Sequence, residues 1–196
     1  MSKEALIHFI LEKTGVPPVK AEEMVSGFRD IRFKKGEFIL EAGKVSDRYL
    51  FLSGGCIRAF TLDLEGNEVT TNFYSPGEVV FEVSSFFQRI PSTEYYQAET
   101  ECEACFIHYE GLNTAFHTMP HFRDFGRAML VNGFVKLKER TLSLINEEAE
   151  IRYDRLIKTK PDIFKHAPLK HIASYLGITD SSLSRIRRNY TQKQKP

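Results

Sequence analysis

Short runs rich in Phe, Tyr, Val and Ile fill the middle of the chain and alternate with turn residues such as Gly, Pro and Asn. Runs of this length and composition predict β-strands, and the turn residues predict where the chain reverses. The predicted strands cover residues 30–40, 49–52, 56–62, 68–74, 78–81 and 95–109. Their regular spacing is typical of a compact antiparallel barrel or roll. Helical patterns at 4–14 and 20–28 precede them.

A helical pattern also extends from about residue 121 to residue 156 and carries a broad apolar stripe. A long apolar helix that links two domains usually packs against another surface. We therefore expect this helix to form the seam of a homodimer. The expected interface residues are Phe125, Met129, Phe134 and Leu137. The alternative is a helix that packs only on its own roll.

Near the end of the chain, apolar residues between 169 and 176 recur with the spacing of one buried helix face, and the same spacing resumes at 183–186. Gly177 separates the two patterns and allows the positive φ that a tight turn demands. Thr179 or Asp180 can cap the second helix. This order predicts a helix-turn-helix.

The second of these helices carries hydroxyl and guanidinium groups, which suit phosphate oxygens and the edges of bases. We therefore expect it to bind DNA. The candidate DNA-binding residues are Thr179, Asp180, Ser181, Ser182, Ser184, Arg185, Arg187 and Arg188. The alternative is an ordinary helical hairpin with a polar outer face.

Charge is divided unevenly along the chain. Residues 158–196 contain nine Lys and Arg against two acidic residues, whereas the remainder has 18 basic and 24 acidic residues. The net charge of +1 for the whole chain hides this division. A basic unit on an acidic body favours a nucleic-acid partner.

The length of 196 residues and the hydrophobic content of 42% allow one medium domain and one small one. No stretch approaches the roughly 18 apolar residues of a membrane span. The N-terminus carries an early acidic residue, Glu4, and we expect no signal peptide there. We therefore expect a cytoplasmic protein with no membrane partner.

Cys102 and Cys105 form a Cys-x-x-Cys motif inside the predicted strand 95–109. Residues three apart on a strand point to opposite faces, and no second pair or suitably spaced histidine accompanies them. We expect buried apolar cysteines, no metal and no cofactor. The six histidines are scattered, with no nucleophile–base pair, so we do not expect an enzyme.

Four short segments that contain glycine lie at 35–40, 49–58, 66–68 and 76–78, and Gly43 lies between the first two. Their order and spacing are together more specific than any one of them. With the flanking helices they resemble the Crp/Fnr family of bacterial transcription regulators over nearly the whole chain. The resemblance implies an α+β fold, with N-terminal helices and an antiparallel β-roll of jelly-roll type. It implies three parts: a cyclic-nucleotide-binding-like sensor at 1–118, a dimerisation helix at 119–147 and a helix-turn-helix at 148–196. It also implies a palindromic DNA operator, and RNA polymerase as a partner if the protein is an activator.

The sequence departs from this family in the ligand site. Glu82 stands where members that bind cyclic nucleotides place an acid for the ribose, but Phe81 replaces the small glycine before it. Ser92 stands where the family has an arginine for the cyclic phosphate, and losing a charge-assisted pair weakens binding strongly. We therefore expect no tight binding of cyclic AMP and name no effector. The residues expected around an effector are Gly77, Phe81, Glu82, Arg89, Ser92, Thr93, Arg140 and Thr141. Alternatively, Glu82 is satisfied by a neighbouring backbone amide.

The DNA-binding end departs as well. Eight residues follow Arg188, so the β-hairpin wing common in the family is expected to be absent or reduced to a basic arm at 189–196. The second helix begins Asp180-Ser181 and lacks the Arg-Glu pair of the best-known members, which predicts a different operator. The alternative function is a cyclic-nucleotide-binding signalling module that does not bind DNA.

Overall fold

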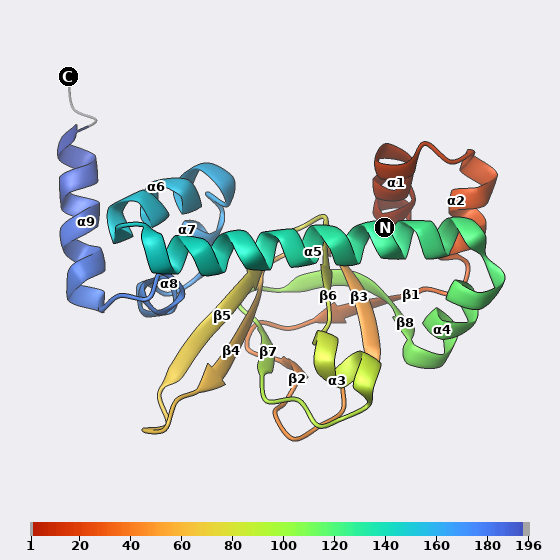
Figure 1. Cartoon of the computed structure of the whole chain (residues 1–196), viewed down its shortest axis with the longest axis horizontal. Helices are drawn as coiled ribbons and strands as arrows, with labels where there is room; N and C mark the ends of the chain where they lie inside the picture. The colour runs from red at the N-terminus through yellow and green to blue at the C-terminus, as the bar shows by residue number, and fades with distance from the viewer. Residues whose placement is uncertain (1, 194–196) are drawn as a thin grey trace.

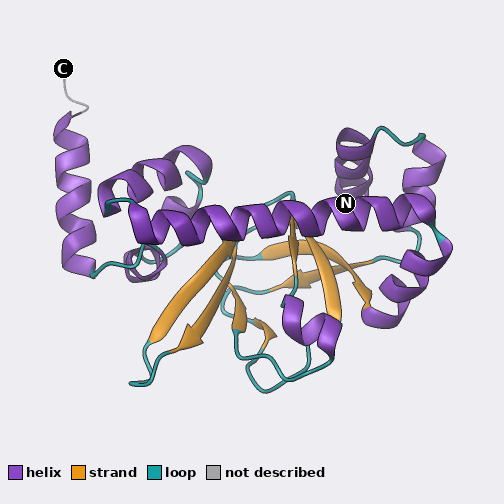
Figure 2. Ribbon diagram, viewed as in Figure 1, coloured by secondary structure: helices purple, strands orange, loops and turns teal. Residues whose placement is uncertain are grey.

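The strands form two four-stranded antiparallel sheets in the computed structural model, which describes residues 2–193 (Figures 1 and 2). One sheet has the order β1-β8-β3-β6 and the other has the order β2-β7-β4-β5. The strands are β1 (Arg29–Phe33), β2 (Phe38–Leu40), β3 (Arg48–Gly54), β4 (Ile57–Leu62), β5 (Glu68–Tyr74), β6 (Glu78–Val80), β7 (Tyr95–Ala98) and β8 (Cys102–His108). Together with the helices around them, they confirm the predicted α+β fold with an antiparallel roll.

Helices precede and follow the roll in the sequence, and one short helix, α3, lies between β6 and β7. The helices are α1 (Ser2–Thr14), α2 (Pro18–Val25), α3 (Val83–Gln88), α4 (Tyr109–Thr118), α5 (Pro120–Asn146), α6 (Ala149–Thr159), α7 (Ile163–His166), α8 (Leu169–Tyr175) and α9 (Asp180–Lys193). Figure 1 shows α5 running along the roll from the N-terminal helices to the C-terminal ones. None of the described helices is long and apolar enough to cross a membrane.

Two predicted strands are wrong in their extent. Residues 30–40 divide into β1 and β2, because Gly36 has φ of +83° and its N–H donates to the carbonyl oxygen of Ala98 at 2.7 Å. Residues 95–109 divide into β7 and β8, which belong to different sheets. Composition marks strand-forming residues, but it does not mark the point where the chain changes sheet.

The predicted helix 121–156 is also wrong in its extent, because the chain bends between α5 and α6. Glu147 is extended there, with φ of −114° and ψ of 146°. Arg155 donates to the Ser143 hydroxyl at 2.8 Å and to the Glu147 carboxylate at 2.5 Å, while Arg152 donates to the Glu147 carbonyl oxygen. No Gly or Pro marks this corner in the sequence, so hydrophobic period alone could not reveal it.

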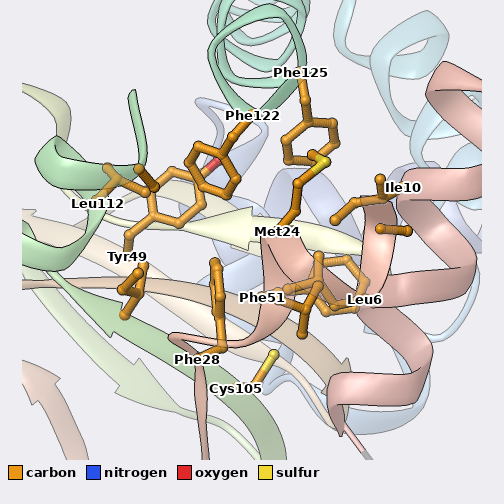
Figure 3. Packing of buried hydrophobic residues seen from close by; sticks show 14 of the residues in the cluster. Leu6, Ile10, Met24, Phe28, Tyr49, Phe51, Cys105, Leu112, Phe122 and Phe125 are labelled. Atoms are coloured by element: carbon orange, nitrogen blue, oxygen red, sulfur yellow. The ribbon is translucent and has the colours of Figure 1, made fainter. Parts of the chain in front are cut away.

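The hydrophobic core has separate clusters. Figure 3 shows the largest, in which Phe28 and Phe51 meet Phe122 and Phe125 from the first turns of α5. Burying each such side chain contributes about 1.5–3 kcal/mol. A second cluster lies inside the roll, and a third joins α6 to α9 and includes Phe73 of β5. The C-terminal helices therefore pack on the roll as well as on one another.

Candidate nucleic-acid interface and roll cavity

α8 and α9 are joined by a closed glycine turn. Gly177 has φ of +68°, as its place in the sequence predicts, and its N–H donates to the carbonyl oxygen of Ser174 at 3.0 Å. The Thr179 hydroxyl accepts from the N–H of Ser182 at 3.3 Å, so Thr179 rather than Asp180 caps α9. The helices pack through Ile172, Ala173, Leu176, Leu183 and Ile186, which are all buried. This fixed scaffold leaves the opposite face of α9 free.

The free face of α9 carries an exposed polar stripe. Ser181, Ser184, Arg185 and Arg188 are three or four residues apart, so they share one side of the helix, and all four are exposed. Hydroxyl and guanidinium groups arranged this way can donate to phosphate oxygens and to base edges. We call these four residues the α9 stripe.

The other predicted DNA-binding residues lie beside the α9 stripe. Thr179 and Asp180 are exposed at the start of α9, and the hydroxyls of Thr179 and Ser182 are 3.0 Å apart. Arg187 is exposed but lies near Tyr153 of α6, where burial raises the pKa of the Tyr153 hydroxyl and the charge of Arg187 opposes that rise. The structure therefore brings all eight predicted residues together on α9 and its cap.

The predicted basic arm differs from the structure. α9 continues to Lys193, so residues 189–193 lengthen the helix. Residues 194–196 lie outside the described part of the chain.

A cavity of about 360 Å³ opens on the roll between the β2–β3 connection and β6. Of the eight predicted effector residues, Phe81 and Glu82 line it. Leu50 and Tyr96 contribute apolar surface to the same wall, and Glu41 contributes charge. The wall of the cavity therefore combines apolar and charged side chains.

The carboxylate of Glu82 caps the N-terminus of α3. Its carboxylate accepts from the N–H of Ser84 at 3.0 Å and from the N–H of Ser85 at 2.5 Å. These contacts cap the first turn of α3, an element that the sequence pattern did not predict. The geometry favours the alternative in which Glu82 is satisfied by backbone amides.

Ser92, Thr93 and Gly77 do not line the cavity. Ser92 is buried, and its hydroxyl lies 2.9 Å from the carbonyl oxygen and 3.0 Å from the nitrogen of Glu94. The carbonyl oxygen of Thr93 accepts from a hydroxyl of β4 at 3.2 Å. Gly77, with φ of +86°, shapes the turn into β6. All three hold the chain path around the roll.

Two cations at or near the cavity, Arg89 and Lys44, are already paired with carboxylates. Arg89 donates to the carboxylate of Asp47 at 2.9 Å, and its guanidinium carbon lies 4.3 Å from the ring centroid of Tyr109. Lys44 donates to Glu41 at 2.6 Å. An anion entering the cavity would have to compete with these carboxylates.

Arg140 and Thr141 lie on α5, away from the cavity. The Arg140 guanidinium stacks 3.7 Å from the ring centroid of Tyr175 and donates to the carbonyl oxygen of that residue at 3.0 Å. The Thr141 hydroxyl donates to the carbonyl oxygen of Leu137 at 2.9 Å. Arg140 therefore connects α5 to α8 and does not face the cavity.

Sequence reasoning missed a polar group inside the roll. The Tyr96 hydroxyl lies 3.3 Å from the carbonyl oxygen of Phe81 and 3.2 Å from a carboxylate oxygen of Glu94. The ring of Tyr74 stacks on Tyr96 with centroids 5.9 Å apart. Burial raises the pKa of Glu94. Alternation along 94–98 could have placed these side chains inside the roll, but it could not have paired them.

The predicted dimer residues on α5 divide into two groups. Phe125 is 2% exposed and belongs to the core of Figure 3, so it cannot form an exposed seam. Met129 packs partly against the same core. Phe134 and Leu137, by contrast, are 68% and 61% exposed. The exposed stripe also includes Leu130, Val131, Val135, Leu142, Leu144 and Ile145.

Cys102 and Cys105 lie on opposite faces of β8, as strand geometry predicts. Cys102 belongs to the cluster inside the roll, and Cys105 belongs to the cluster under α1. Both are free and buried. Within residues 2–193, no group of three or more His, Cys, Asp or Glu side chains is arranged to hold a metal ion.

Comparison with known proteins supports the roll directly. Residues 30–118 match the family described as the cyclic nucleotide-binding domain. Electron transport regulator A of Shewanella oneidensis is 25% identical over 164 residues, which cover 78% of this chain and 65% of the relative. The chain thus spans slightly less than two thirds of the length of that relative.

Three solved structures share the fold over most of the chain. The c-di-GMP responsive global regulator CLP of Xanthomonas campestris has a TM-score of 0.67 at 16% identity, covering 90% of this chain and 93% of that one. FixK2 of Bradyrhizobium japonicum has a TM-score of 0.71 at 15% identity, covering 85% of each chain. A putative transcriptional regulator of the crp/fnr family from Eubacterium rectale has a TM-score of 0.70 at 14% identity, covering 95% and 88%. At these identities the likeness shows the fold alone.

Proposed function

We propose that this chain is a transcription regulator of the Crp/Fnr type, which binds a DNA operator as a homodimer and senses a signal through its β-roll. The α9 stripe carries this proposal. Its residues are exposed on a helix whose other side is fixed by a packed core. A recognition helix needs this combination, because base edges are read by side chains held at a constant position in the major groove.

Charge supports the same proposal. The nine basic residues of 158–196 lie in the C-terminal unit, and the acidic excess lies in the rest of the chain. Attraction to phosphates supplies most of the non-specific affinity for DNA. The acidic body would be repelled, which favours approach through the C-terminal helices.

The exposed stripe of α5 supports a homodimer. Phe134 and Leu137 lie in a run of exposed apolar side chains, and exposed apolar patches of this kind mark interaction surfaces. A symmetric dimer through α5 would present two copies of α9, matching a palindromic operator. The seam is proposed without Phe125, since that residue is buried.

The sensed signal is not proposed to be cyclic AMP. Four carboxylates and two cations line the cavity, and one of these cations, Lys44, already pairs with Glu41. A cyclic phosphate needs a fixed cation and free N–H donors, whereas Glu82 uses two N–H groups of α3. The effector therefore stays unnamed. We propose that such a regulator works in the cytoplasm. If it activates transcription, RNA polymerase is a further partner.

The proposal is tested by selecting bound duplexes from a library with a randomised central region, using the full chain. We expect one palindromic sequence to be enriched and its affinity to fall steeply with salt, because bound phosphates release counterions. The double variant Arg185→Ala/Arg188→Ala should lose the enrichment. Its matched control, Arg29→Ala/Arg32→Ala, removes two exposed arginines from β1 and should retain it.

Absence of any enriched sequence would overturn the proposal. If cyclic nucleotide binding accompanied that absence, the alternative signalling module would be favoured, and the match of residues 30–118 already supports such a domain.

A further inference from the structure

An ionic cluster of four residues, of which Glu68 is exposed, lies where α8 meets the roll. Arg58 of β4 is 1% exposed, and its Nε lies 3.0 Å from Oε1 of Glu99, in the turn between β7 and β8. The Nη2 of Arg58 donates to Oε2 of Glu68 on β5 at 2.6 Å. His171 of α8 completes the cluster, with Nδ1 2.8 Å from the same Oε1 of Glu99. Arg58 therefore contacts two carboxylates, and it shares one oxygen of Glu99 with the imidazole of His171.

Both ring nitrogens of His171 face carboxylate oxygens. Its Nδ1 contacts Glu99, and its Nε2 lies 3.6 Å from Oε2 of Glu68. A neutral imidazole has one N–H, so its other nitrogen would point a lone pair toward a carboxylate. The imidazolium has two N–H groups and can donate to both sides. The geometry therefore suits the protonated ring better than the neutral one.

The charge balance leads to the same conclusion. Arg58 contributes one positive charge, and Glu68 and Glu99 contribute two negative ones. Burial alone would raise the pKa of Glu68, but the hydrogen bond and charge of Arg58, with smaller contributions from His171 and Lys170, lower it. Protonation of His171 brings the net charge of the four groups to zero. Glu99 is 8% exposed and gains most from this balance, whereas the side chain of Glu68 is 43% exposed and is screened by water.

The cluster lies at the surface that docks the helix-turn-helix on the roll. β5 is an edge strand, and the N–H of Thr70 donates to the hydroxyl of Ser174 on α8 at 2.9 Å. The rings of Phe73 and Tyr175 meet edge to face with centroids 5.4 Å apart. Figure 1 shows α8 beside the ends of β4 and β5 that lie nearest α5. The position of α9 follows from this docking, because α8 and α9 share one core.

We propose that protonation of His171 tightens the docking of the helix-turn-helix on the roll, so that pH controls how firmly the DNA-binding unit is held. Histidine is the side chain whose charge changes between about pH 5 and 8. The charged groups facing it are Glu99, Glu68 and Arg58 from the roll and Lys170 from α8. The proposed effect of pH on docking does not depend on the proposed function. Its effect on DNA binding rests on that function.

The amide of Thr70 reports docking specifically, because its acceptor belongs to α8. Hydrogen exchange of the 15N-labelled full chain, with each rate divided by the intrinsic chemical rate at that pH, measures the protection. We expect the protection of Thr70 to fall several-fold between about pH 6 and 8, the range in which a histidine side chain loses its charge. The amide of Ala98, which donates to Glu37 within the roll at 3.0 Å, should keep its protection.

Variants separate His171 from other titrating groups. His171→Gln keeps a hydrogen-bonding side chain but cannot gain charge, so the protection of Thr70 should become independent of pH. His117→Asn removes an exposed histidine at the end of α4 and should behave as the wild type. If His171→Gln does not fold, the pH dependence of Thr70 protection in the wild type still tests the proposal. Constant protection of Thr70 across this range, or a fall shared equally by Ala98, would overturn the proposal.

DNA binding gives a second, separate readout. If the proposed function holds, operator affinity should decline with rising pH more steeply in the wild type than in His171→Gln, because a loosely held unit must be ordered on binding. A chain that binds no DNA would overturn the proposed function, while the Thr70 measurement would still decide the docking.

Discussion

Lys160, at the end of α6, donates a hydrogen bond to the carboxylate of Glu78 on β6 at 2.7 Å. The same ammonium group donates to the carbonyl oxygen of Phe73 at 2.6 Å. Two residues after Glu78, Val80 lines the roll cavity. The strand that leads into the cavity is thus directly bonded to the C-terminal helices, which makes Glu78 a link between the two parts.

Glu78→Gln should destabilise the fold by about 1.5–3 kcal/mol at pH 7, the range for hydrogen bonds to charged groups. Burial alone would raise the pKa of Glu78, but the charge and hydrogen bond of Lys160 outweigh it and lower the pKa. A lowered carboxyl pKa contributes stability above the ordinary glutamate value, and this stability is lost as pH falls through the folded value. Urea unfolding at several pH values should show a smaller acid-induced loss in Glu78→Gln than in the wild type.

The control for this prediction is Glu22→Gln, an exposed glutamate on α2. It should leave both stability and its pH dependence unchanged. Equal behaviour of the two variants would mean that the bond between Glu78 and Lys160 contributes no net stability.

Arg185→Ala should relax sequence preference at one operator position by roughly 1–3 kcal/mol, because a guanidinium can contact guanine through two hydrogen bonds. Arg187→Ala and Arg188→Ala should instead lower the affinity for specific DNA and for random DNA to the same extent, as expected for phosphate contacts. Competition titrations with single-base operator variants measure the difference. If Arg185→Ala lowered the affinity for specific and random DNA equally, Arg185 would be a phosphate contact and not a base contact.

Leu137→Asp should produce monomers, because a dimer through α5 would bury the new carboxylate without a partner. Leu137 is 61% exposed in the single chain, so folding should be little affected. Sedimentation measures the assembly, and operator affinity should fall with it. Leu64→Asp is the matched control, since Leu64 is fully exposed at the tip of the β4–β5 hairpin. A wild-type chain that sediments as a monomer at micromolar concentration would refute the seam.

Cyclic AMP and cyclic GMP should bind no more tightly than about 100 μM, which corresponds to about 5.5 kcal/mol. Ser92 is buried and offers a neutral hydroxyl, and Glu82 is committed to α3. Calorimetry with each nucleotide tests this, and low-micromolar binding would contradict it. Ser92→Arg alone should restore little affinity, because Ser92 does not line the cavity and Phe81 still does.

Local pattern was sufficient for several features. Alternating strand-forming runs predicted the roll, and the helical spacing around Gly177 predicted both the turn and its positive φ, which the structure confirms. These features depend on residues close in sequence, where side-chain period and backbone freedom act directly. The same reasoning predicted opposite faces for Cys102 and Cys105.

Other features were decided by residues far apart in the chain. Whether Phe125 faced the core or a seam depended on α1 and α2 packing against α5, and the corner at Glu147 depended on arginines of α6.

The sequence by itself therefore determined the fold class, the approximate places of most strands and helices, and the polar face of α9. The tertiary structure decided which side chains meet, as when Arg58 and His171 share Glu99 across more than one hundred residues. The physical reason is that period and propensity are local properties, whereas charge pairing and burial arise once distant segments have come into contact.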